Sequence, residues 1–368
     1  MRKKIIITGG HLTPALATIA VLESRGWEIV YVGRRNALEG DETISQEFRQ
    51  IKSMGIRFIN LTTGRLQRKL TFHGLISLLK VPLGLVNSCK ILKGEQPQVV
   101  LSFGGYIALP IAIGAWFMRI PVITHEQTSA AGLANRIIGI FARKICISQD
   151  VTTGFFSKSK ICLTGIPIRP EIFQVKEKIN IDEDKPLLYI TGGSLGAHSL
   201  NVLIEPIIGE LIQEFAVIHQ CGETVFYKDY ERLSGIKEKL AKALKHRYYP
   251  IPYLNQNTIG WVLNSARIIV ARAGANTVSE ILILKKPAMF VPLPWAGGDE
   301  QLKNAKLLSV HDAALVVLQK NLTPDLLLQQ IKLLYKKRHT FQSNLQIMSK
   351  NFIQDGASRL VNVVESEV

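Results

Sequence analysis

Cysteine is scarce in this sequence of 368 residues, and its four cysteines are scattered. Cys89, Cys146, Cys162 and Cys221 form no C-x-x-C pair and no other recognisable metal-ligand spacing. Their positions argue against a disulfide framework and a structural zinc site, and they fit a protein of a reducing cytoplasm. We therefore expect that no cofactor is required, while the residues leave a requirement for a divalent cation open.

Long apolar runs are missing as well. No stretch reaches the roughly 18 uninterrupted apolar residues of a membrane helix, so no membrane span is expected. The apolar run of Ile5, Ile6 and Ile7 stops at Gly9 and Gly10, which favours a first β-strand over a signal peptide. The G-x-G-x-x-G pattern of dinucleotide-binding proteins is absent too, so NAD is not favoured as a ligand.

Acidic and aromatic residues are both few. Lysine and arginine number 45 against 29 aspartate and glutamate residues, which gives a net charge of +16. This surplus suits an anionic partner: nucleic acid, an acidic membrane surface or a phosphorylated substrate. Aromatic residues make up 7% and form no array interleaved with basic residues, so a nucleic-acid partner is not expected.

What the sequence does contain is a repeated strand–turn–helix pattern. Residues 5–7 predict a buried strand, and after a glycine-rich turn residues 14–25 predict a helix. Residues 171–185 have the composition of a linker, and residues 186–190 then predict a second such strand with its own glycine-rich turn. The length and the apolar content of 47% fit two α/β domains with doubly wound parallel sheets.

Polar and glycine-rich segments follow three predicted strands of the first half. They are Gly9-Gly10-His11, Gly104-Gly105-Tyr106 and His125-Glu126-Gln127, and Asn135 lies in the helix after the last of them. Because parallel strands end at one edge of a sheet, the three segments together predict a site more strongly than any one alone. The residues leave it open whether His11 is catalytic or structural.

The second half carries a phosphate-binding pattern. Residues 268–271 predict a buried strand, Gly274 breaks the chain, and residues 275–284 predict a helix. Unpaired N–H groups at such a helix start attract phosphate. The Glu280 carboxylate further along the helix can accept hydrogen bonds from the two hydroxyls of a ribose. The alternative is an ordinary helix start with a favourable acid near its positive end.

Two further segments strengthen the phosphate interpretation. The strand predicted at 288–291 ends in a proline-rich loop, after which Asp299, Glu300 and Gln301 open the next helix. The turn at 192–196 offers backbone N–H groups and the Ser194 hydroxyl to a phosphate. Successive strand ends with polar groups describe a ligand crevice at the edge where parallel strands end.

Residues 61–94 combine lysines and arginines with leucines and other apolar residues. Such a segment can lie on an anionic bilayer surface. The expected membrane contacts are Phe72, Leu75, Leu79, Lys80 and, from a later segment, Trp116. The alternative, of equal weight, is an ordinary buried helix with solvated lysines. Pro82 predicts a kink or an end in this helix.

Taken in order, these segments resemble the MurG family, bacterial glycosyltransferases that add N-acetylglucosamine (GlcNAc) to lipid I during peptidoglycan synthesis. The resembling segments are 8–15, 103–106, 125–127, 131–135, 165–169, 192–197, 272–280, 299–301 and 304–305, which together span nearly the whole chain. The resemblance implies an α/β GT-B fold, with two Rossmann-like doubly wound parallel-sheet domains facing across a cleft. The expected domains are 1–163 for the acceptor and the membrane, and 164–345 for the UDP-sugar. A C-terminal helix, 346–368, would pack back on the first domain.

The resemblance also implies an activity and a location. The reaction would be an inverting transfer of GlcNAc from UDP-GlcNAc to the 4-hydroxyl of the N-acetylmuramyl group of lipid I, a polyprenyl-pyrophosphate-linked acceptor, to form lipid II. The protein would be peripheral, on the anionic inner leaflet at the cytoplasmic face of the cell membrane. Its partners would include a cell-wall synthesis complex, and the processes served would be cell shape and cell division.

The same resemblance implies roles for individual residues. The donor residues would be Arg169, Ser194, Asn201, Leu254, Gly274, Asn276, Thr277, Glu280, Glu300, Gln301 and Asn304. The acceptor and pyrophosphate residues would be Thr8, Gly9, Gly10, Gly104, Gly105, Tyr106, His125 and Asn135. His11 or Glu126 would be the base that acts on the acceptor hydroxyl. We prefer His11, because an imidazole with a pKa of about 6.5 is largely neutral at pH 7, whereas Glu126 would need desolvation to become comparably basic.

The sequence departs from the family pattern at Ile6, Ile7, Thr128, Ile166 and Glu300. Two alternatives therefore stay open beside the lipid I enzyme. One is another GT-B transferase with a different UDP-sugar or lipid acceptor. The other is a non-catalytic protein that binds a nucleotide-sugar or a lipid.

Overall fold

The structure is a computed structural model, and it describes residues 3–36, 44–63, 72–128, 131–193, 196–222, 224, 226–295 and 299–368. The side chains of residues 72–81 and of residue 151 are outside this description.

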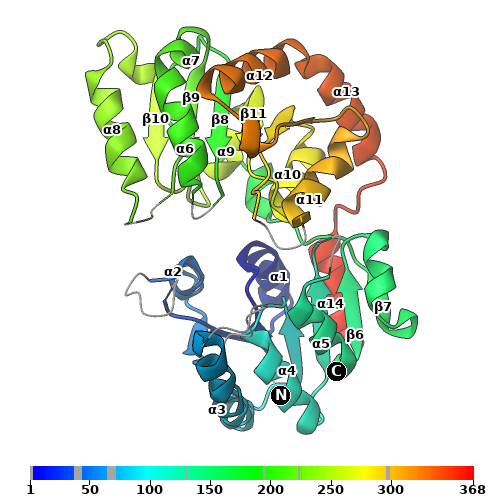
Figure 1. The fold of residues 1–368 in the computed structure, drawn as a ribbon. Coiled ribbons are helices and arrows are strands. Elements are labelled where there is room, and N and C mark those ends of the chain that lie inside the picture. Colours follow the sequence, from blue (N-terminus) through cyan, green and yellow to red (C-terminus); the bar gives the residue numbers. More distant parts are fainter. Residues whose placement is uncertain are drawn as a thin grey trace. The chain divides into compact units, whose positions relative to one another are not determined.

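Contacts within the chain divide it into two compact units. The first unit holds Met1–Arg169 and Ile353–Val368, and the second holds Pro170–Phe352, so the chain passes between them twice (Figure 1). Gly165 packs so closely on the first unit's returning segment that a β-carbon there would lie 2.7 Å from the Ile353 side chain. This packing keeps residue 165 and its neighbours with the first unit, slightly beyond the boundary predicted at 163.

In the described part of the first unit, seven strands form a parallel sheet in the order β3-β2-β1-β4-β5-β6-β7. They are β1 (Lys4–Thr8), β2 (Glu28–Gly33), β3 (Arg57–Asn60), β4 (Val99–Ser102), β5 (Val122–Glu126), β6 (Lys144–Ile147) and β7 (Ile161–Leu163). The central strands are rich in isoleucine and valine and are buried almost throughout, as expected for parallel strands that are covered on both faces.

Helices cover both faces of this sheet. They are α1 (Leu12–Ser24), α2 (Gln46–Ser53), α3 (Phe72–Glu95), α4 (Ala108–Phe117), α5 (Leu133–Phe141) and the returning α14 (Gly356–Glu365), with short 3-10 helices η1 (Asp150–Phe155) and η2 (Lys158–Lys160). Side chains alternate along a strand, so Ile5 and Ile7 join one core with α1 and α14. Ile6 points to the opposite face and joins the core under α3, α4 and α5.

Helix α3 continues through Pro82. Of the kink or end predicted at this proline, the end is therefore wrong and the kink stays a prediction. A proline removes one backbone donor, and here the turns on both sides keep the backbone helical. Among the described residues, no helix combines the length and the apolar character that crossing a bilayer requires.

In the described part of the second unit, six parallel strands follow the order β10-β9-β8-β11-β12-β13. They are β8 (Leu187–Thr191), β9 (Ala216–Gln220), β10 (Tyr248–Ile251), β11 (Ile268–Ala271), β12 (Ala288–Phe290) and β13 (Leu315–Val316). The two sheets therefore share the doubly wound pattern that the sequence predicts.

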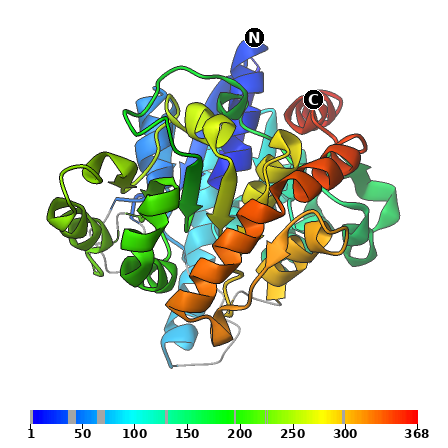
Figure 2. The same cartoon turned by 90° about the horizontal axis from the view of Figure 1, so that it is seen from above.

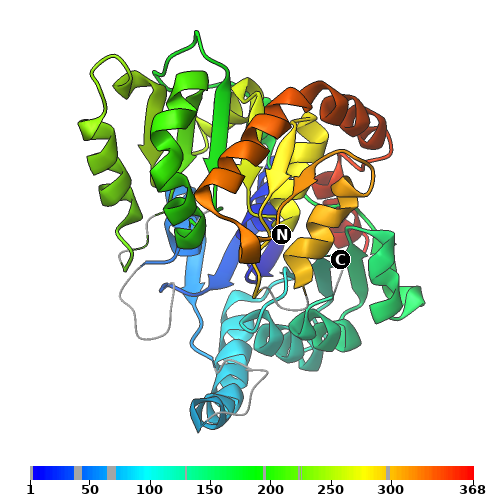
Figure 3. The ribbon, with the colours of Figure 1, turned by 45° about the horizontal axis from the view of Figure 1, so that its top comes forward.

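The helices of the second unit pack on both faces of its sheet. They are α6 (His198–Ile204), α7 (Ile208–Glu214), α8 (Asp229–Lys239), α9 (Ile259–Ser265), α10 (Ala275–Leu284), α11 (Glu300–Ser309), α12 (Pro324–Lys336) and α13 (Arg338–Ser349), with 3-10 helices η3 (Pro170–Phe173), η4 (Glu205–Ile207), η5 (Lys245–Arg247) and η7 (Gln319–Asn321). The orange helix α12 packs beside α6 and against β11 and β12 (Figures 2 and 3). Thr323 caps α12, and its hydroxyl oxygen accepts a hydrogen bond from the Leu326 N–H at 3.3 Å.

Candidate functional site

Three turns meet at one edge of the first sheet. Because β4 lies between β1 and β5, the segments that follow these strands are neighbours at the edge where the strands end. The turns are packed backbone to backbone: the Gly10 N–H donates to the Gly104 carbonyl at 3.1 Å. A β-carbon on Gly9 would lie 2.7 Å from the Phe103 backbone, and one on Gly104 would lie 2.8 Å from the Asn135 amide. Glycine is therefore required at both positions.

His11 is the residue just before α1, and its side chain reaches the segment that follows β5. Its Nδ1 lies 2.7 Å from the Nε2 of Gln127, although the two residues are 116 positions apart. Burial lowers the pKa of the His11 imidazole, and the nearby Glu126 charge opposes that effect only in part. The ring is therefore neutral at pH 7, which is the state that a general base needs.

Glu126 is surrounded by hydrogen-bond donors. Thr128 donates to its Oε1 twice, from the backbone N–H at 2.9 Å and from Oγ1 at 2.8 Å. The Gly132 N–H and the Asn135 Nδ2 donate to Oε2 at 3.0 and 2.9 Å. The side chain is only 2% exposed. A carboxylate offers about four acceptor positions, so this one has little capacity left for a substrate proton.

The remaining predicted acceptor residues lie around these turns. His125 is buried and its Nε2 bonds the Gly165 carbonyl at 3.1 Å, and burial lowers its pKa to about 4. Asn135 accepts from the Thr124 hydroxyl at 2.9 Å while its amide reaches Glu126, so it holds that carboxylate in place. Thr8 is buried, and its Oγ1 has no hydrogen-bond partner among the described residues. The Arg34 guanidinium lies over the Tyr106 ring, 5.0 Å from its centroid.

The second sheet carries its own cluster of strand ends. β8, β11 and β12 are neighbours, so the segments after them meet at one edge. Gly274 precedes α10 and provides no side-chain cap, which leaves the first N–H groups of that helix to other acceptors. Thr277 and the buried Glu280 lie one turn apart on α10, and Asn276 lies in its first turn. Ser194 lies outside the described residues.

Helix α11 is tied to the same edge. The Gln301 Oε1 accepts from the Leu293 N–H at 3.0 Å, and the Asn304 Nδ2 donates to the Ala273 carbonyl at 3.2 Å. Glu300 is the first residue of this helix. The three contribute polar groups from a segment that follows β12, as the sequence predicts. Arg169, another predicted donor residue, belongs to the first unit and is the residue at which the chain leaves it for the second.

Asn201 is fully buried behind the turn that follows β8. Its Nδ2 donates to the Cys221 carbonyl at 2.9 Å and to Asp229 at 2.8 Å, and its Oδ1 lies 3.0 Å from the His219 Nε2. These contacts are all with protein groups, so the residue supports the turn from inside the unit. Its predicted contact with the donor stays a prediction.

Two residues at this edge were given no role by the sequence analysis. Arg272 is buried, and its guanidinium donates to the Val291 carbonyl at 2.8 Å, to Ser199 at 2.8 Å and to Gln319 at 2.6 Å. Gln220 contacts both the turn after β8 and the Leu254 backbone. Gln220 is the last residue of β9, at the edge of the sheet where the other site segments begin. This position is the signal that could have found it.

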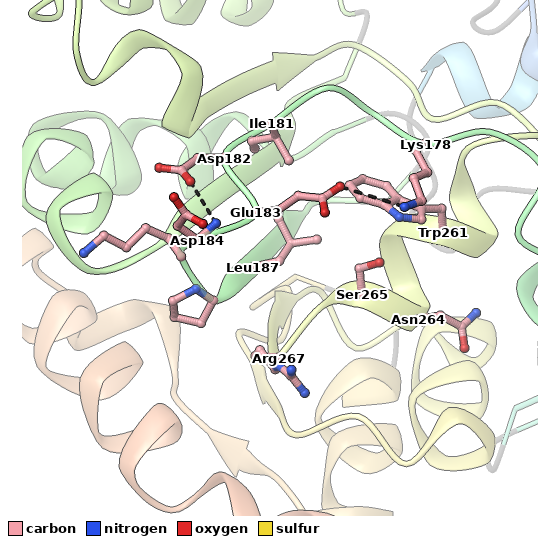
Figure 4. Close-up of a pocket in the computed structure, with 12 residues that line it drawn as sticks. Lys178, Ile181, Asp182, Glu183, Asp184, Leu187, Trp261, Asn264, Ser265 and Arg267 are labelled. Carbon is pink, nitrogen blue, oxygen red and sulfur yellow. Dashed lines mark hydrogen bonds and ion pairs between the residues drawn. The ribbon is translucent and has the colours of Figure 1, made fainter.

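An open pocket of about 520 Å³ lies at the opposite edge of the second sheet, where β8 and β11 begin (Figure 4). Its wall includes Lys178, Lys185 and Arg267 beside Asp182, Glu183 and Asp184. These charges balance one another, and Lys178 pairs with Glu183 at 4.0 Å. A pocket of balanced charge at the start of the strands does not suit a diphosphate.

The expected membrane contacts are only partly described. The side chains of Phe72, Leu75, Leu79 and Lys80 lie outside the description. Trp116 is 49% exposed at the end of α4, and the adjacent Phe117 is 64% exposed. Among the described residues, there is no group of three or more histidine, cysteine, aspartate or glutamate side chains that could hold a metal ion.

Comparison with known proteins places the chain in a family. The model of the glycosyltransferase family 28 N-terminal domain matches residues 6–147, and the model of the family's C-terminal domain matches residues 187–360. A Clostridium tetani protein is 32% identical over 375 residues, with 99% of this chain and 98% of the relative covered. A Legionella pneumophila protein is 29% identical over 378 residues, with 100% and 98% covered. Both are named UDP-N-acetylglucosamine–N-acetylmuramyl-(pentapeptide) pyrophosphoryl-undecaprenol N-acetylglucosamine transferase.

Solved structures show the same fold. MurG from Acinetobacter baumannii superposes with a TM-score of 0.70 at 24% identity, covering 99% of both chains. The glycosyltransferase of kitacinnamycin superposes with a TM-score of 0.72 at 15% identity. The predicted fold class, two Rossmann-like parallel-sheet domains of GT-B type, is confirmed, and so is the resemblance to the MurG family. The chain belongs to glycosyltransferase family 28.

Proposed function

We propose that this protein transfers GlcNAc from UDP-GlcNAc to the 4-hydroxyl of the N-acetylmuramyl group of lipid I, with inversion, to form lipid II of peptidoglycan synthesis. The observation that carries the donor half is helix α10, which combines an uncapped start at Gly274 with the buried carboxylate of Glu280. The first feature suits a diphosphate and the second suits a ribose. The names of the full-length relatives support both the donor and the acceptor.

The second unit is the proposed donor side. Glu280 would accept hydrogen bonds from the ribose hydroxyls, and the α10 start from Gly274 to Thr277 would bind the diphosphate, joined by Ser194 and Arg169. Asn276, Glu300, Gln301 and Asn304 would complete the sugar and phosphate contacts. Leu254 would lie on the uracil side. The polar groups of α10 and α11 meet at one sheet edge, which supports this division of roles.

The first unit is the proposed acceptor side. The turns with Gly9, Gly10, Gly104 and Gly105 would lie near the lipid pyrophosphate, and Thr8, Tyr106, His125 and Asn135 would surround them. His11 would remove the proton of the acceptor 4-hydroxyl as that oxygen attacks the anomeric carbon of the donor sugar. UDP leaves as the new glycosidic bond forms, and helix-start N–H groups and Arg169 would stabilise the charge on its diphosphate.

The amide of Gln127 sets the tautomer of His11. When the Gln127 NH₂ group faces the His11 ring, Nδ1 of His11 accepts a hydrogen bond and the ring hydrogen lies on Nε2 of His11. If the Gln127 amide is rotated by half a turn, its oxygen accepts from Nδ1–H of His11. The lone pair on Nε2 of His11 is then available to accept a proton. Amide nitrogen and oxygen are assigned from such networks, and the base role of His11 requires the second arrangement.

A donor screen tests the proposed function directly. The protein is incubated with a soluble lipid I analogue and a panel of UDP-sugars, and disaccharide product is measured. Turnover with UDP-GlcNAc supports the proposal, whereas turnover with another UDP-sugar identifies a different GT-B transferase. Binding of UDP-GlcNAc with no turnover on any acceptor would identify a non-catalytic binding protein.

We expect Glu280→Ala to lower the affinity for UDP at least about tenfold, because each hydrogen bond to a charged group contributes about 1.5–3 kcal/mol and 1.4 kcal/mol is a factor of ten. Titration calorimetry with UDP measures the change. Glu210→Ala, which removes an exposed acid from α7, is the matched control and should bind as the wild type does. Unchanged UDP affinity in Glu280→Ala would show that the Glu280 carboxylate does not bind the ribose.

The acceptor is a lipid, and we propose that the first unit meets the anionic inner leaflet as a peripheral protein at the cytoplasmic face, within a cell-wall synthesis complex. The basic segment 61–94 and the exposed pair Trp116 and Phe117 support this placement, since apolar side chains insert while lysines attract anionic headgroups.

Binding to vesicles with anionic lipid is expected to weaken in high salt, because surface charges are screened over a Debye length of about 10 Å at 0.1 M. It should weaken further in a Trp116→Ser, Phe117→Ser double variant and in a Leu75→Asp, Leu79→Asp variant. Ile347→Ser, which removes a side chain that is 65% exposed on α13, is the control. Co-sedimentation measures all four proteins, and equal binding to neutral and anionic vesicles would contradict the membrane role.

A further inference from the structure

Gln220 ends β9, and its buried side-chain amide joins two segments of the proposed donor site. Its Nε2 donates to the Gly193 carbonyl at 2.8 Å, in the turn after β8. Its Oε1 accepts from the Leu254 N–H at 3.4 Å, in the segment after β10, and from the Tyr189 hydroxyl at 3.0 Å. The side chain is 5% exposed, so these three groups and not water fix its position.

The orientation of this amide is not ambiguous. A backbone carbonyl can only accept a hydrogen bond and a backbone N–H can only donate one. Rotating the Gln220 amide by half a turn would place its oxygen against the Gly193 carbonyl and its NH₂ group against the Leu254 N–H. Both contacts would then be repulsive, so the backbone on each side requires the observed arrangement.

The Gly193 carbonyl is held from two sides. The Gly196 N–H donates to it at 3.1 Å within the turn, and Gln220 donates to it from the neighbouring strand. Gly193 and Gly196 both have positive φ, at +87° and +74°, the left-handed region that glycine adopts readily. A carbonyl oxygen repels a phosphate, and the two bonds keep the Gly193 oxygen on the protein side of the turn.

We propose that Gln220 is a positioning residue for UDP-GlcNAc, which couples the diphosphate side of the donor site at Gly193 to the uracil side at Leu254. The inference rests on the proposed function, since it takes the second unit as the donor site. Gln220 touches neither end of the ligand in this account. It acts by holding two backbone segments, from β8 and β10, at a fixed separation across β9.

Three variants separate the two connections. Gln220→Glu keeps an acceptor for Leu254 and Tyr189 but replaces the donor to Gly193 by a carboxylate oxygen. Gln220→Met removes all three bonds at similar volume. Tyr189→Phe removes only the hydroxyl that donates to Gln220 and leaves the hydrogen bonds of Gln220 to Gly193 and Leu254 in place. It is therefore the matched control. Calorimetric affinities for uridine and for UDP, together with kcat and KM for UDP-GlcNAc, are measured for each protein.

In Gln220→Glu at pH 8 we expect the UDP affinity to fall about tenfold or more, because a repelled carbonyl replaces a hydrogen bond. Uridine affinity should change by less than about twofold, so the ratio of the two affinities falls. KM should rise while kcat at saturating donor is nearly retained. At pH 5 the introduced carboxyl is protonated in part and can donate to Gly193, so UDP affinity relative to wild type should recover. A purely structural residue would show no such recovery.

The remaining outcomes decide the inference. Gln220→Met should lower the affinity for both uridine and UDP. Tyr189→Phe should bind both ligands with affinities within about twofold of the wild type. If Gln220→Met does not fold, Gln220→Glu carries the test, and thermal melting reports which has occurred. An unchanged ratio of UDP to uridine affinity in Gln220→Glu, with no pH dependence, would overturn the coupling. A wild-type protein that binds no UDP would instead refute the proposed function itself.

Discussion

Replacing His11 by alanine is expected to lower kcat by about 10²–10⁴-fold, the usual cost of losing a general base. Affinity for UDP-GlcNAc should stay nearly unchanged, because the proposed donor contacts are Arg169 and residues of the second unit, and His11 is not one of them. The His11 imidazole combines a neutral state with a contact to Gln127, the residue that directly follows β5. Steady-state kinetics at saturating donor and acceptor measure the effect.

The pH profile sharpens this expectation. A base must be unprotonated, so activity is lost as pH falls through the pKa of His11. Because burial lowers that pKa below its ordinary value, the acid limb of kcat should lie below pH 6.5. His339→Ala, which removes an exposed histidine from α13, is the control and should leave kcat unchanged. If His11→Ala keeps most of its kcat and Glu126→Gln loses it, Glu126 is the base.

Glu126→Gln is expected to lower the melting temperature by roughly 5–20 °C. The new NH₂ group faces two of the four donors that now bond the carboxylate, and each buried donor left without an acceptor costs about 1–3 kcal/mol. In a unit of this size 1 kcal/mol shifts the melting temperature by about 2–4 °C. Activity per folded molecule, and its pH profile, should be much less affected than in His11→Ala.

Thr128→Val is the matched control for that experiment. It removes one of the two Thr128 donors and leaves the backbone N–H on the carboxylate, so a smaller drop of a few degrees is expected. Differential scanning calorimetry compares the three proteins. A Glu126→Gln variant that melts as the wild type does, yet loses at least about a hundredfold in kcat, would make Glu126 the base and reverse these roles.

The sequence predicts the edges of the two sheets well, for a simple physical reason. Runs such as residues 5–7 and 268–271 are β-branched and apolar, glycines follow them, and parallel strands all end at the same edge. The strand order then brings the segments after β1, β4 and β5 together, as expected. The roles assigned to individual residues at those edges stay predictions.

Contacts between distant side chains could not be predicted in this way. Gln127 contacts His11 across 116 positions, and Gln220 contacts Gly193 across 27. These contacts depend on the order of the strands in each sheet. The family resemblance assigns Asn201 to the donor site. It lies fully buried among protein groups, and its contact with the donor stays a prediction. The helix end predicted at Pro82 is absent for a local reason. The helical turns on both sides of the proline outweigh the loss of one backbone donor.

The return of α14 to the first unit has a consequence for the order in which the protein is made. Leu360, Val361 and Val364 belong to the same core as Ile5 and Ile7, so the sheet of the first unit lacks part of its cover until residues 360–364 are translated. The second unit is continuous between Pro170 and Phe352 and is complete sooner. Domains generally fold as units during synthesis, starting from the N-terminus. In this chain the unit that emerges first from the ribosome is the one that finishes folding last.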